Sequence, residues 1–109
     1  MIIGIDYFGT IDKYPRQFKK LARAYLAAGY PVYIITAVKP DRVTAVERMV
    51  RASRMPYTEL EIVTFEDFRQ LAHLKLQAAR KRGVRLMYED IQEVCELLAH
   101  HGIMTAQIR

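Results

Sequence analysis

The chain has 109 residues, of which 51% are apolar, and a formal net charge of +5. That length suits one compact domain, residues 1–109, and leaves no room for a second. No apolar run approaches the roughly 20 residues of a membrane span, and the first residues lack the pattern of a signal peptide. We therefore expect a cytoplasmic protein with no membrane partner. The single cysteine, Cys95, agrees with a reducing compartment.

The charged residues favour anionic partners, because 17 lysines and arginines outnumber 12 aspartates and glutamates. A basic surface suits phosphorylated molecules and nucleic acid. The basic residues are spread along the chain, however, and this pattern is typical of solvated helix faces. No aromatic-basic signature of a nucleic-acid-binding module accompanies them, so charge is the one argument for that partner.

Segments with the pattern of strands alternate with segments that have the pattern of helices. The first half predicts a strand at residues 2–7, a helix at 15–28 ended by Gly29, a strand at 31–36, and a helix capped by Asp41 that carries Val43, Val46, Met49 and Val50. The second half predicts a strand at 60–65, a helical region at 66–82 in one or two pieces, a strand at 84–88, a helix with the apolar stripe Ile91, Val94, Cys95 and Leu98, and a strand at 103–108.

This alternation indicates an α/β fold. We expect a single three-layer Rossmann-like domain, in which a five-stranded, mainly parallel sheet carries helices on both faces. The carboxyl ends of parallel strands lie at one edge of the sheet, and open α/β folds place their chemistry there. Gly4 and Gly9 do not have the GxGxxG spacing, so we do not expect a dinucleotide site.

Polar residues stand at the ends of several predicted strands. Asp6 belongs to the end of the first, Thr36 ends the second, and Glu89 and Asp90 follow the fourth, while Lys75 lies on the helix before it. Clustered carboxylates repel one another unless a cation compensates, and Mg²⁺ prefers oxygen ligands. A metal and a lysine can neutralise phosphoryl oxygens, a hydroxyl can hold one of them, and an ionised aspartate can attack phosphorus.

Four segments, in order, resemble the motifs of the haloacid dehalogenase superfamily. IIGIDYFGT resembles the first motif, apolar residues followed by Asp-x-Asp-Gly-Thr, and VYIIT resembles the second, a strand that ends in Thr or Ser. Lys75 fits the lysine of the third motif, and LMYEDIQEV resembles the fourth, an apolar strand followed by an acidic pair. GIMTAQI fits the final short strand, so the resemblance covers nearly the whole chain.

The resemblance implies a magnesium-dependent phosphohydrolase that forms an aspartyl-phosphate on an unidentified phosphate ester. Asp6 would be the nucleophile and a Mg²⁺ ligand, and Lys75 would steady Asp6 and the phosphoryl charge. The other Mg²⁺ ligands would be the backbone carbonyl of Phe8 and the side chains of Glu89 and Asp90. The phosphoryl group would be held by Gly9, Thr10, Thr36, Ala37 and Lys75.

One position departs from the family pattern. In the family's phosphatases a second aspartate at the position of Phe8 protonates the leaving group and then activates water. General acid–base help of this kind is typically worth about 10²–10⁴-fold, and phenylalanine provides neither step. Asp12 is a conceivable substitute, although an acid in a turn or at a helix start fits it better. The alternative is a catalytically inactive protein of this fold that binds metal, phosphate or a partner.

No cap domain fits in the chain. Thr10 and Phe18 are separated by seven residues, and Phe65 and Lys75 by nine. We therefore expect an open site that admits a small molecule or a large substrate such as a phosphorylated polymer, or a homo-oligomer in which a second subunit supplies the lid.

Two other interpretations stay open. The Glu89–Asp90 pair can also cap a helix, since acids are favoured at a helix N-terminus. A phosphoacceptor domain of the receiver type also joins Asp, Thr, Lys and Mg²⁺, but it has an acidic pair after its first strand and the phosphorylated Asp after its third. Here Asp6 stands alone after the first strand and Asp67 follows the third, so that match is poorer.

Overall fold

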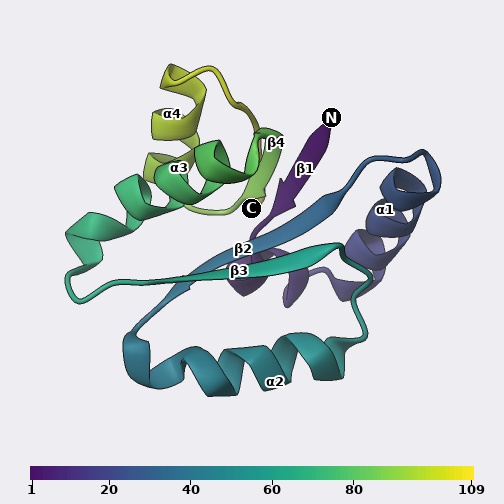
Figure 1. Ribbon diagram of the computed structural model, residues 1–109, viewed down its shortest axis with the longest axis horizontal. Helices are drawn as coiled ribbons and strands as arrows, with labels where there is room; N and C mark the ends of the chain where they lie inside the picture. Colours follow the sequence, from purple (N-terminus) through teal and green to yellow (C-terminus); the bar gives the residue numbers. More distant parts are fainter.

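Five parallel strands in the order β3-β2-β1-β4-β5 form the centre of the computed structural model, which describes residues 1–109 (Figure 1). The strands are β1 (Ile2–Ile5), β2 (Val32–Val38), β3 (Glu59–Thr64), β4 (Val84–Glu89) and β5 (Met104–Gln107). The helices are α1 (Pro15–Ala27), α2 (Val43–Ser53), α3 (Leu71–Arg82) and α4 (Gln92–His100). Three short turns complete the set: η1 (Tyr7–Ile11), η2 (Pro40–Arg42) and η3 (Phe68–Gln70).

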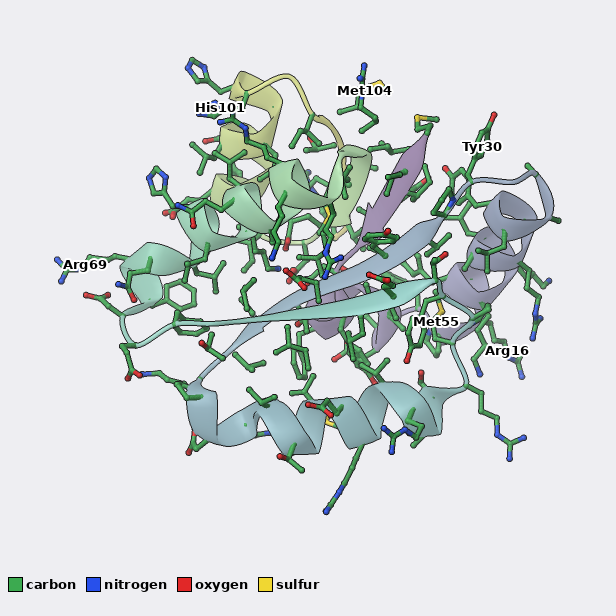
Figure 2. All side chains as sticks on the ribbon, in the orientation of Figure 1. Arg16, Tyr30, Met55, Arg69, His101 and Met104 are labelled. Carbon is green, nitrogen blue, oxygen red and sulfur yellow. The ribbon has the colours of Figure 1, made fainter.

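The helices cover both faces of the sheet, as expected for an α/β sandwich. The apolar sides of α1 and α2 pack with β1 and β2 in one core, which includes Phe18, Val50 and the buried Met55 labelled in Figure 2. The apolar sides of α3 and α4 pack on the opposite face in a second core, around Met87 and Leu98. Figure 1 shows the two pairs of helices on opposite sides of the sheet. The fold class is therefore the predicted one, and every pair of neighbouring strands is parallel.

The order of the strands reverses beside Asp6. The chain moves outward from β1 through β2 to β3, and then returns to the other side of β1 with β4 and β5. Ligands of open α/β sheets bind at the carboxyl ends of the strands where the order reverses in this way. Here that point lies between β1 and β4, whose last residues are Ile5 and Glu89.

The ends of two strands differ from the sequence prediction by two residues each. The first strand ends at Ile5 rather than Tyr7, because the chain turns after Asp6 into η1, where the Asp12 N–H donates to the Tyr7 carbonyl at 3.1 Å. The second strand continues two residues beyond Thr36, paired with β3. Region 66–82 falls into two pieces, η3 and α3.

The prediction that Asp41 caps α2 was wrong. Pro40 starts the η2 turn, which takes Asp41 into the turn, and Arg42 then precedes α2 with no side-chain cap. Proline favours the first position of such a turn because its φ is already fixed.

No inserted domain lies at either of the two positions where a cap would enter. Residues 12–14 alone join η1 to α1, and residues 65–67 alone join β3 to η3. None of the helices combines the length and apolar character that a bilayer crossing requires.

Candidate active site

A lysine and two carboxylates form a buried cluster between the sheet and α3. The Lys75 ammonium donates to Asp6 Oδ1 at 2.8 Å and to Glu89 Oε1 at 2.6 Å. Asp6 and Lys75 are each 2% exposed, and Glu89 is 0% exposed. Three residues that are distant in the chain thus meet at the carboxyl edge of the sheet.

Strand alternation explains why the acids point toward Lys75. The Asp6 N–H donates to the Tyr88 carbonyl at 2.9 Å, which places Asp6 beside Glu89. The space over Gly4 in β1 is filled by Met87 of β4, on the face that α3 and α4 cover. Side chains two residues apart share a face of a strand, so Asp6 and Glu89 also project toward α3.

Burial shifts the ionisation of all three groups. It raises the pKa of Asp6 well above its ordinary value; Lys75 partly lowers this pKa, and the neighbouring carboxyls of Glu89 and Asp90 raise it. Burial likewise raises the pKa of Glu89, against the lowering effect of Lys75. For Lys75, burial lowers the pKa, but the two carboxylates raise it by more and the net shift is upward. The lysine stays charged at neutral pH, and its charge compensates one carboxylate.

Both oxygens of Glu89 already have partners. Oε1 accepts from Lys75, and Oε2 accepts from the backbone N–H groups of Asp90 at 3.0 Å and Ile91 at 3.1 Å. Glu89 therefore anchors the lysine and also satisfies amides just before α4, as the helix-cap interpretation expected of the acidic pair. The Glu89 carbonyl accepts from the Cys95 thiol at 3.4 Å, and Cys95 is buried in α4 as expected for a core residue.

Asp90 provides the third carboxylate. One ligand atom from each of Asp6, Glu89 and Asp90 lies within 4.8 Å of the other two. Oδ1 of Asp90 is buried without a hydrogen-bond partner. A Cβ at Gly9 would overlap the other oxygen of Asp90, and Gly9 has a φ of +76°. Glycine at position 9 therefore permits both the turn and the approach of Asp90.

This donor set fits a hard cation such as Mg²⁺. All of its ligand atoms are carboxylate oxygens, the three carboxylates are accompanied by one lysine that contacts two of them, and Oδ1 of Asp90 has neither a hydrogen-bond donor nor a cation as partner. Asp6 and Asp90 are the acids with an oxygen to offer, since Glu89 is engaged twice. The carbonyl of Phe8 is in the same turn, and its role as a ligand stays a prediction.

Two threonine hydroxyls are also buried without partners. Thr10 is 0% exposed and Thr36 is 1% exposed, and neither Oγ1 makes a hydrogen bond. A buried polar atom of this kind is costly unless a ligand or water completes it. Both residues were predicted to hold a phosphoryl group, and these hydroxyls are free to do so.

The backbone of Ala37 faces the same region. The carbonyl of Pro31 accepts from β1, whereas the carbonyl of Val38 accepts from the segment that follows β3. Backbone groups alternate between the two sides of a strand, so Ala37 directs its N–H toward the β1 side. The pairing of β1 with β2 ends at Ile5, so this N–H points beyond the end of β1.

The η1 turn holds the remaining predicted residues. Phe8 is half-buried, packs against the first core, and its ring meets that of Tyr7 edge to face at 5.2 Å. Asp12 Oδ1 accepts from the Gly9 N–H at 2.7 Å, so Asp12 is a turn acid and the Gly9 amide is already engaged. No acid therefore stands at the position of Phe8.

A groove that Phe8 helps to line lies on the α1/α2 side of the sheet, opposite the face toward which Asp6 and Glu89 project. Its volume is about 280 Å³, and Phe8, Val38, Lys39, Arg42 and Val46 line it. Lys39 and Arg42 are not among the site residues predicted from the sequence. The available signal was their place directly after the second strand, at the edge that the site occupies.

The cluster itself is less open than expected for a capless domain. None of the four surface hollows is lined by Asp6, Lys75 or Glu89. Gly9 and Asp90, both half-buried, connect the cluster with the surface. The lysine and the η1 turn thus cover the carboxylates, although no cap domain is present.

Comparison with known proteins shows the fold. No family model and no curated protein matches the chain. Nine chains of solved structures match. A chain of a Pnkp1/Rnl/Hen1 complex has a TM-score of 0.77 and 15% identity over 98% of this chain, which spans 45% of that chain's length. A universal stress protein in complex with cAMP has a TM-score of 0.66 and 14% identity, with 100% of this chain and 96% of that chain covered. At these identities the likeness is one of fold alone.

Proposed function

We propose that this protein is a magnesium-dependent phosphohydrolase of the haloacid dehalogenase type, with Asp6 as the nucleophile. The observation that carries the proposal is the buried contact of Lys75 with Asp6 and Glu89, with the Asp90 carboxylate beside them. A structural ion pair does not need a third carboxylate with an unpartnered oxygen. A cation site does, because the cation carries the positive charge that this arrangement lacks, and with Lys75 it can then offset the negative charge of a phosphoryl group.

In the first step a carboxylate oxygen of Asp6 forms a bond to phosphorus as the bond from phosphorus to the ester oxygen breaks. The leaving oxygen keeps the electron pair and takes a proton from water, since Phe8 has none to give. Lys75 orients Asp6 and offsets negative charge on the phosphoryl group, whose oxygens accept from the hydroxyls of Thr10 and Thr36. Asp6 and Asp90 would hold Mg²⁺, which would supply further positive charge when bound.

The second step is expected to be slow. Water must attack the phosphoryl group on Asp6, which returns the carboxylate and releases inorganic phosphate. No carboxylate is placed to take a proton from that water, because Phe8 is apolar and Asp12 is bound to Gly9. Loss of this help costs about 10²–10⁴-fold, so the aspartyl-phosphate should accumulate.

The test is a burst experiment with a phosphoester that has a good leaving group. In Mg²⁺ we expect about one equivalent of alcohol to be released quickly, followed by slow turnover, and a hydroxylamine-sensitive phosphoenzyme. Asp6→Asn should abolish both. Asp12→Asn is the matched control, since an amide oxygen can still accept from Gly9. Absence of turnover and of phosphoenzyme across a broad panel of phosphoesters would refute the proposal.

One observation favours a second function, that of a binding protein. Phe8 is packed into the first core at the position where catalysis would need an acid. A descendant without activity would keep the pocket and bind Mg²⁺ and phosphate. Calorimetry separates the two functions: Mg²⁺ and vanadate would bind, while no phosphoenzyme would form from any phosphoester.

A further inference from the structure

The positive charge of the chain is concentrated in one layer of the fold. Residues 12–54, which include α1 and α2, contain ten lysines and arginines but three acids, a net charge of +7. The other residues contain seven cations and nine acids, a net charge of −2. Since α1 and α2 cover the same face of the sheet, basic residues that are dispersed in the sequence gather on one side of the molecule.

The cations of this layer are not neutralised by the protein. The five ion pairs of the structure involve Arg69, Lys75 and Arg82, all outside residues 12–54. Nine of the ten cations in the layer are exposed and the tenth, Lys19, is half-buried. Arg16, for example, lies on the outer side of α1 (Figure 2). A face of uncompensated charge attracts polyanions.

The groove that Phe8 helps to line belongs to this basic layer. Its floor is apolar, from Phe8, Val38 and Val46, and Lys39 and Arg42 are exposed at its rim. The Lys39 ammonium is held there, because it donates to the Glu66 carbonyl at 3.0 Å. The groove thus combines an aromatic side chain with two cations.

Two links join the groove to the site. Phe8 is two residues from Asp6 and lies in the turn that covers the site. Val38 shares a face of β2 with Thr36, because the two are two residues apart in one strand. The Asp6 carboxylate projects toward the opposite, α3-covered face. A phosphoryl group held at the carboxyl edge by Thr36 therefore has this groove next to it.

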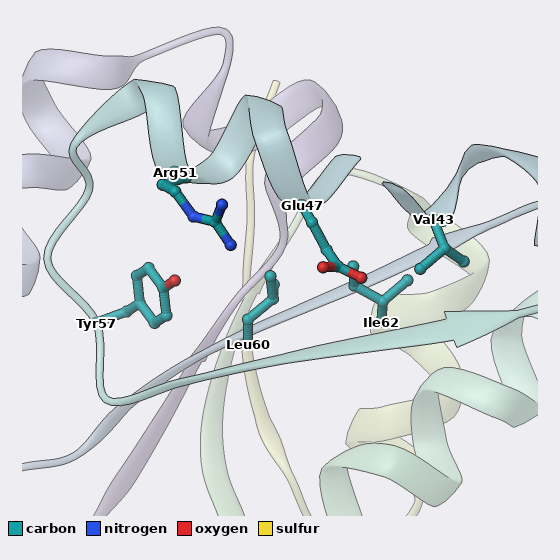
Figure 3. Close-up of a pocket in the computed structure, with 6 residues that line it drawn as sticks. All are labelled: Val43, Glu47, Arg51, Tyr57, Leu60 and Ile62. Carbon is teal, nitrogen blue, oxygen red and sulfur yellow. The ribbon is translucent and has the colours of Figure 1, made fainter. Parts of the chain in front are cut away.

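A second hollow lies on the other flank of α2. This hollow of about 340 Å³ is lined by Val43, Glu47, Arg51, Tyr57, Leu60 and Ile62. Figure 3 shows Arg51 and Tyr57 side by side there, with Glu47 farther along the helix. The hollow on each flank of α2 thus has one arginine and one aromatic residue in its lining, and the second also has the acid Glu47.

We propose that the α1/α2 layer binds a single-stranded nucleic acid, with its phosphorylated end in the candidate site and its terminal base against Phe8. The identification of that end as the substrate rests on the proposed function. Proteins that bind single strands combine a basic track with aromatic rings on which bases stack. An unpaired end suits a narrow groove, because its base can turn out to meet a side chain.

Fluorescence anisotropy with labelled oligonucleotides of about 12 nucleotides, phosphorylated at the 5′ or the 3′ end or at neither, tests the surface. The Asp6→Asn variant in Mg²⁺ keeps the phosphate in place during the measurement. The variant pair is Lys39→Gln with Arg42→Gln. The control pair is Arg80→Gln with Arg85→Gln, which removes the same charge from exposed, unpaired positions outside the layer.

Loss of two phosphate contacts should reduce the slope of log affinity against log salt by about 1.4, or about 25-fold in affinity at 0.1 M salt. The control pair should change affinity by less than about threefold. Phe8→Leu keeps the apolar floor but removes the ring, and should weaken binding by about 5- to 100-fold through the lost stacking. Removal of the terminal phosphate should weaken binding by at least several-fold.

Equal effects of the two variant pairs, or affinity independent of the terminal phosphate, would overturn the inference. Equal or tighter binding to anionic lipid vesicles would also overturn it. Turnover of small phosphoesters without oligonucleotide binding would refute this inference and leave the proposed function standing. Binding of the phosphorylated end, without phosphate release or phosphoenzyme in the wild type, would refute the proposed function and leave the binding surface standing.

Discussion

Replacement of Lys75 by methionine removes the one cation in contact with two buried carboxylates. The methionine side chain has a similar length and keeps the apolar contacts of α3, so loss of charge is the main change. Asp6 and Glu89 then lie almost without solvent, at 2% and 0% exposure, with only the amides of Asp90 and Ile91 as donors to Glu89. The substitution therefore tests whether this cluster is ionised and buried.

Two processes limit how much free energy of unfolding the substitution removes. Breaking a buried ion pair on one side costs about 3–5 kcal/mol. The stranded carboxylate can escape this cost by taking a proton, which for an ordinary pKa near 4 costs about 5 kcal/mol at pH 7.5 and about 2 kcal/mol at pH 5.5. We therefore expect a loss of about 3–5 kcal/mol in the free energy of unfolding at pH 7.5 and of no more than about 2 kcal/mol at pH 5.5.

The pH dependence has a definite sign. The folded pKa values of Asp6 and Glu89 lie above their unfolded values. At a pH between the unfolded and the folded pKa, the folded chain therefore binds more protons than the unfolded chain. The free energy of unfolding then falls as pH rises through this window. Lys75 lowers both carboxyl pKa values in the wild type, and its own raised pKa contributes stability below its unfolded pKa. Without Lys75 the folded pKa values of both carboxyls rise further, so the pH window between unfolded and folded pKa extends to higher pH. The free energy of unfolding then falls more steeply as the pH rises.

Urea unfolding followed by circular dichroism, at both pH values and without metal, measures the effect. Lys81→Met is the matched control, because Lys81 is an exposed lysine of the same helix without an ion pair and should change stability by about 0.5 kcal/mol or less. A variant of Lys75 that is unfolded at pH 7.5 should refold at pH 5.5. A loss below about 1 kcal/mol at pH 7.5, or an equal loss at both pH values, would refute the reasoning.

Four further predictions concern the site and its surroundings. Gly9→Ala should lower both stability and Mg²⁺ affinity, because the new Cβ would displace Asp90. The control Gly29→Ala, at a φ of +88° with no neighbouring atoms, should cost only the backbone strain of about 1–2 kcal/mol. Thermal melts of both variants with and without Mg²⁺ measure the difference. Phe8→Asp should raise the steady-state rate of phosphate release by about 10²–10⁴-fold, and an unchanged rate in a folded variant would contradict the assigned role of this position. Mg²⁺ should raise the melting temperature more at pH 8 than at pH 5.5, since carboxyls with raised pKa must first lose protons, and Asp90→Asn should remove this difference. Burial raises the pKa of Cys95 to about 11. At pH 8 its thiol should therefore react with iodoacetamide at least roughly 200-fold more slowly in the folded protein than after unfolding in urea. A fast reaction of the folded protein would show that α4 does not bury Cys95.

Much of the architecture could be predicted from the sequence, because the patterns that indicate strands and helices are local. Apolar β-branched runs alternate with amphipathic segments, and this alternation is enough for a parallel sheet covered by helices. It also placed Asp6 and the Glu89–Asp90 pair at strand ends, where parallel strands share one edge, whereas Thr36 lies two residues before the end of β2. The cap of α2 was misassigned because Pro40 starts a turn that takes Asp41 past the capping position.

Lys75 shows where local reasoning stops. Its helix neighbours Leu71, Leu76 and Ala79 are buried, so the lysine occupies an apolar face that the sequence pattern does not reserve for a charge. Only its contact with Asp6 and Glu89, which come from two other elements, compensates that burial.

The chain by itself determined the order of strands and helices and the polar residues at the strand ends, because propensity and periodicity act over a few neighbouring residues. The tertiary structure alone decided which groups meet. Asp90 approaches Gly9, both carboxylate oxygens of Glu89 accept hydrogen bonds, and the basic helices α1 and α2 pack on the same face of the sheet. These contacts depend on how the strands are ordered and how each helix is rotated about its axis. Both are set by packing over the whole sheet, which no short segment encodes.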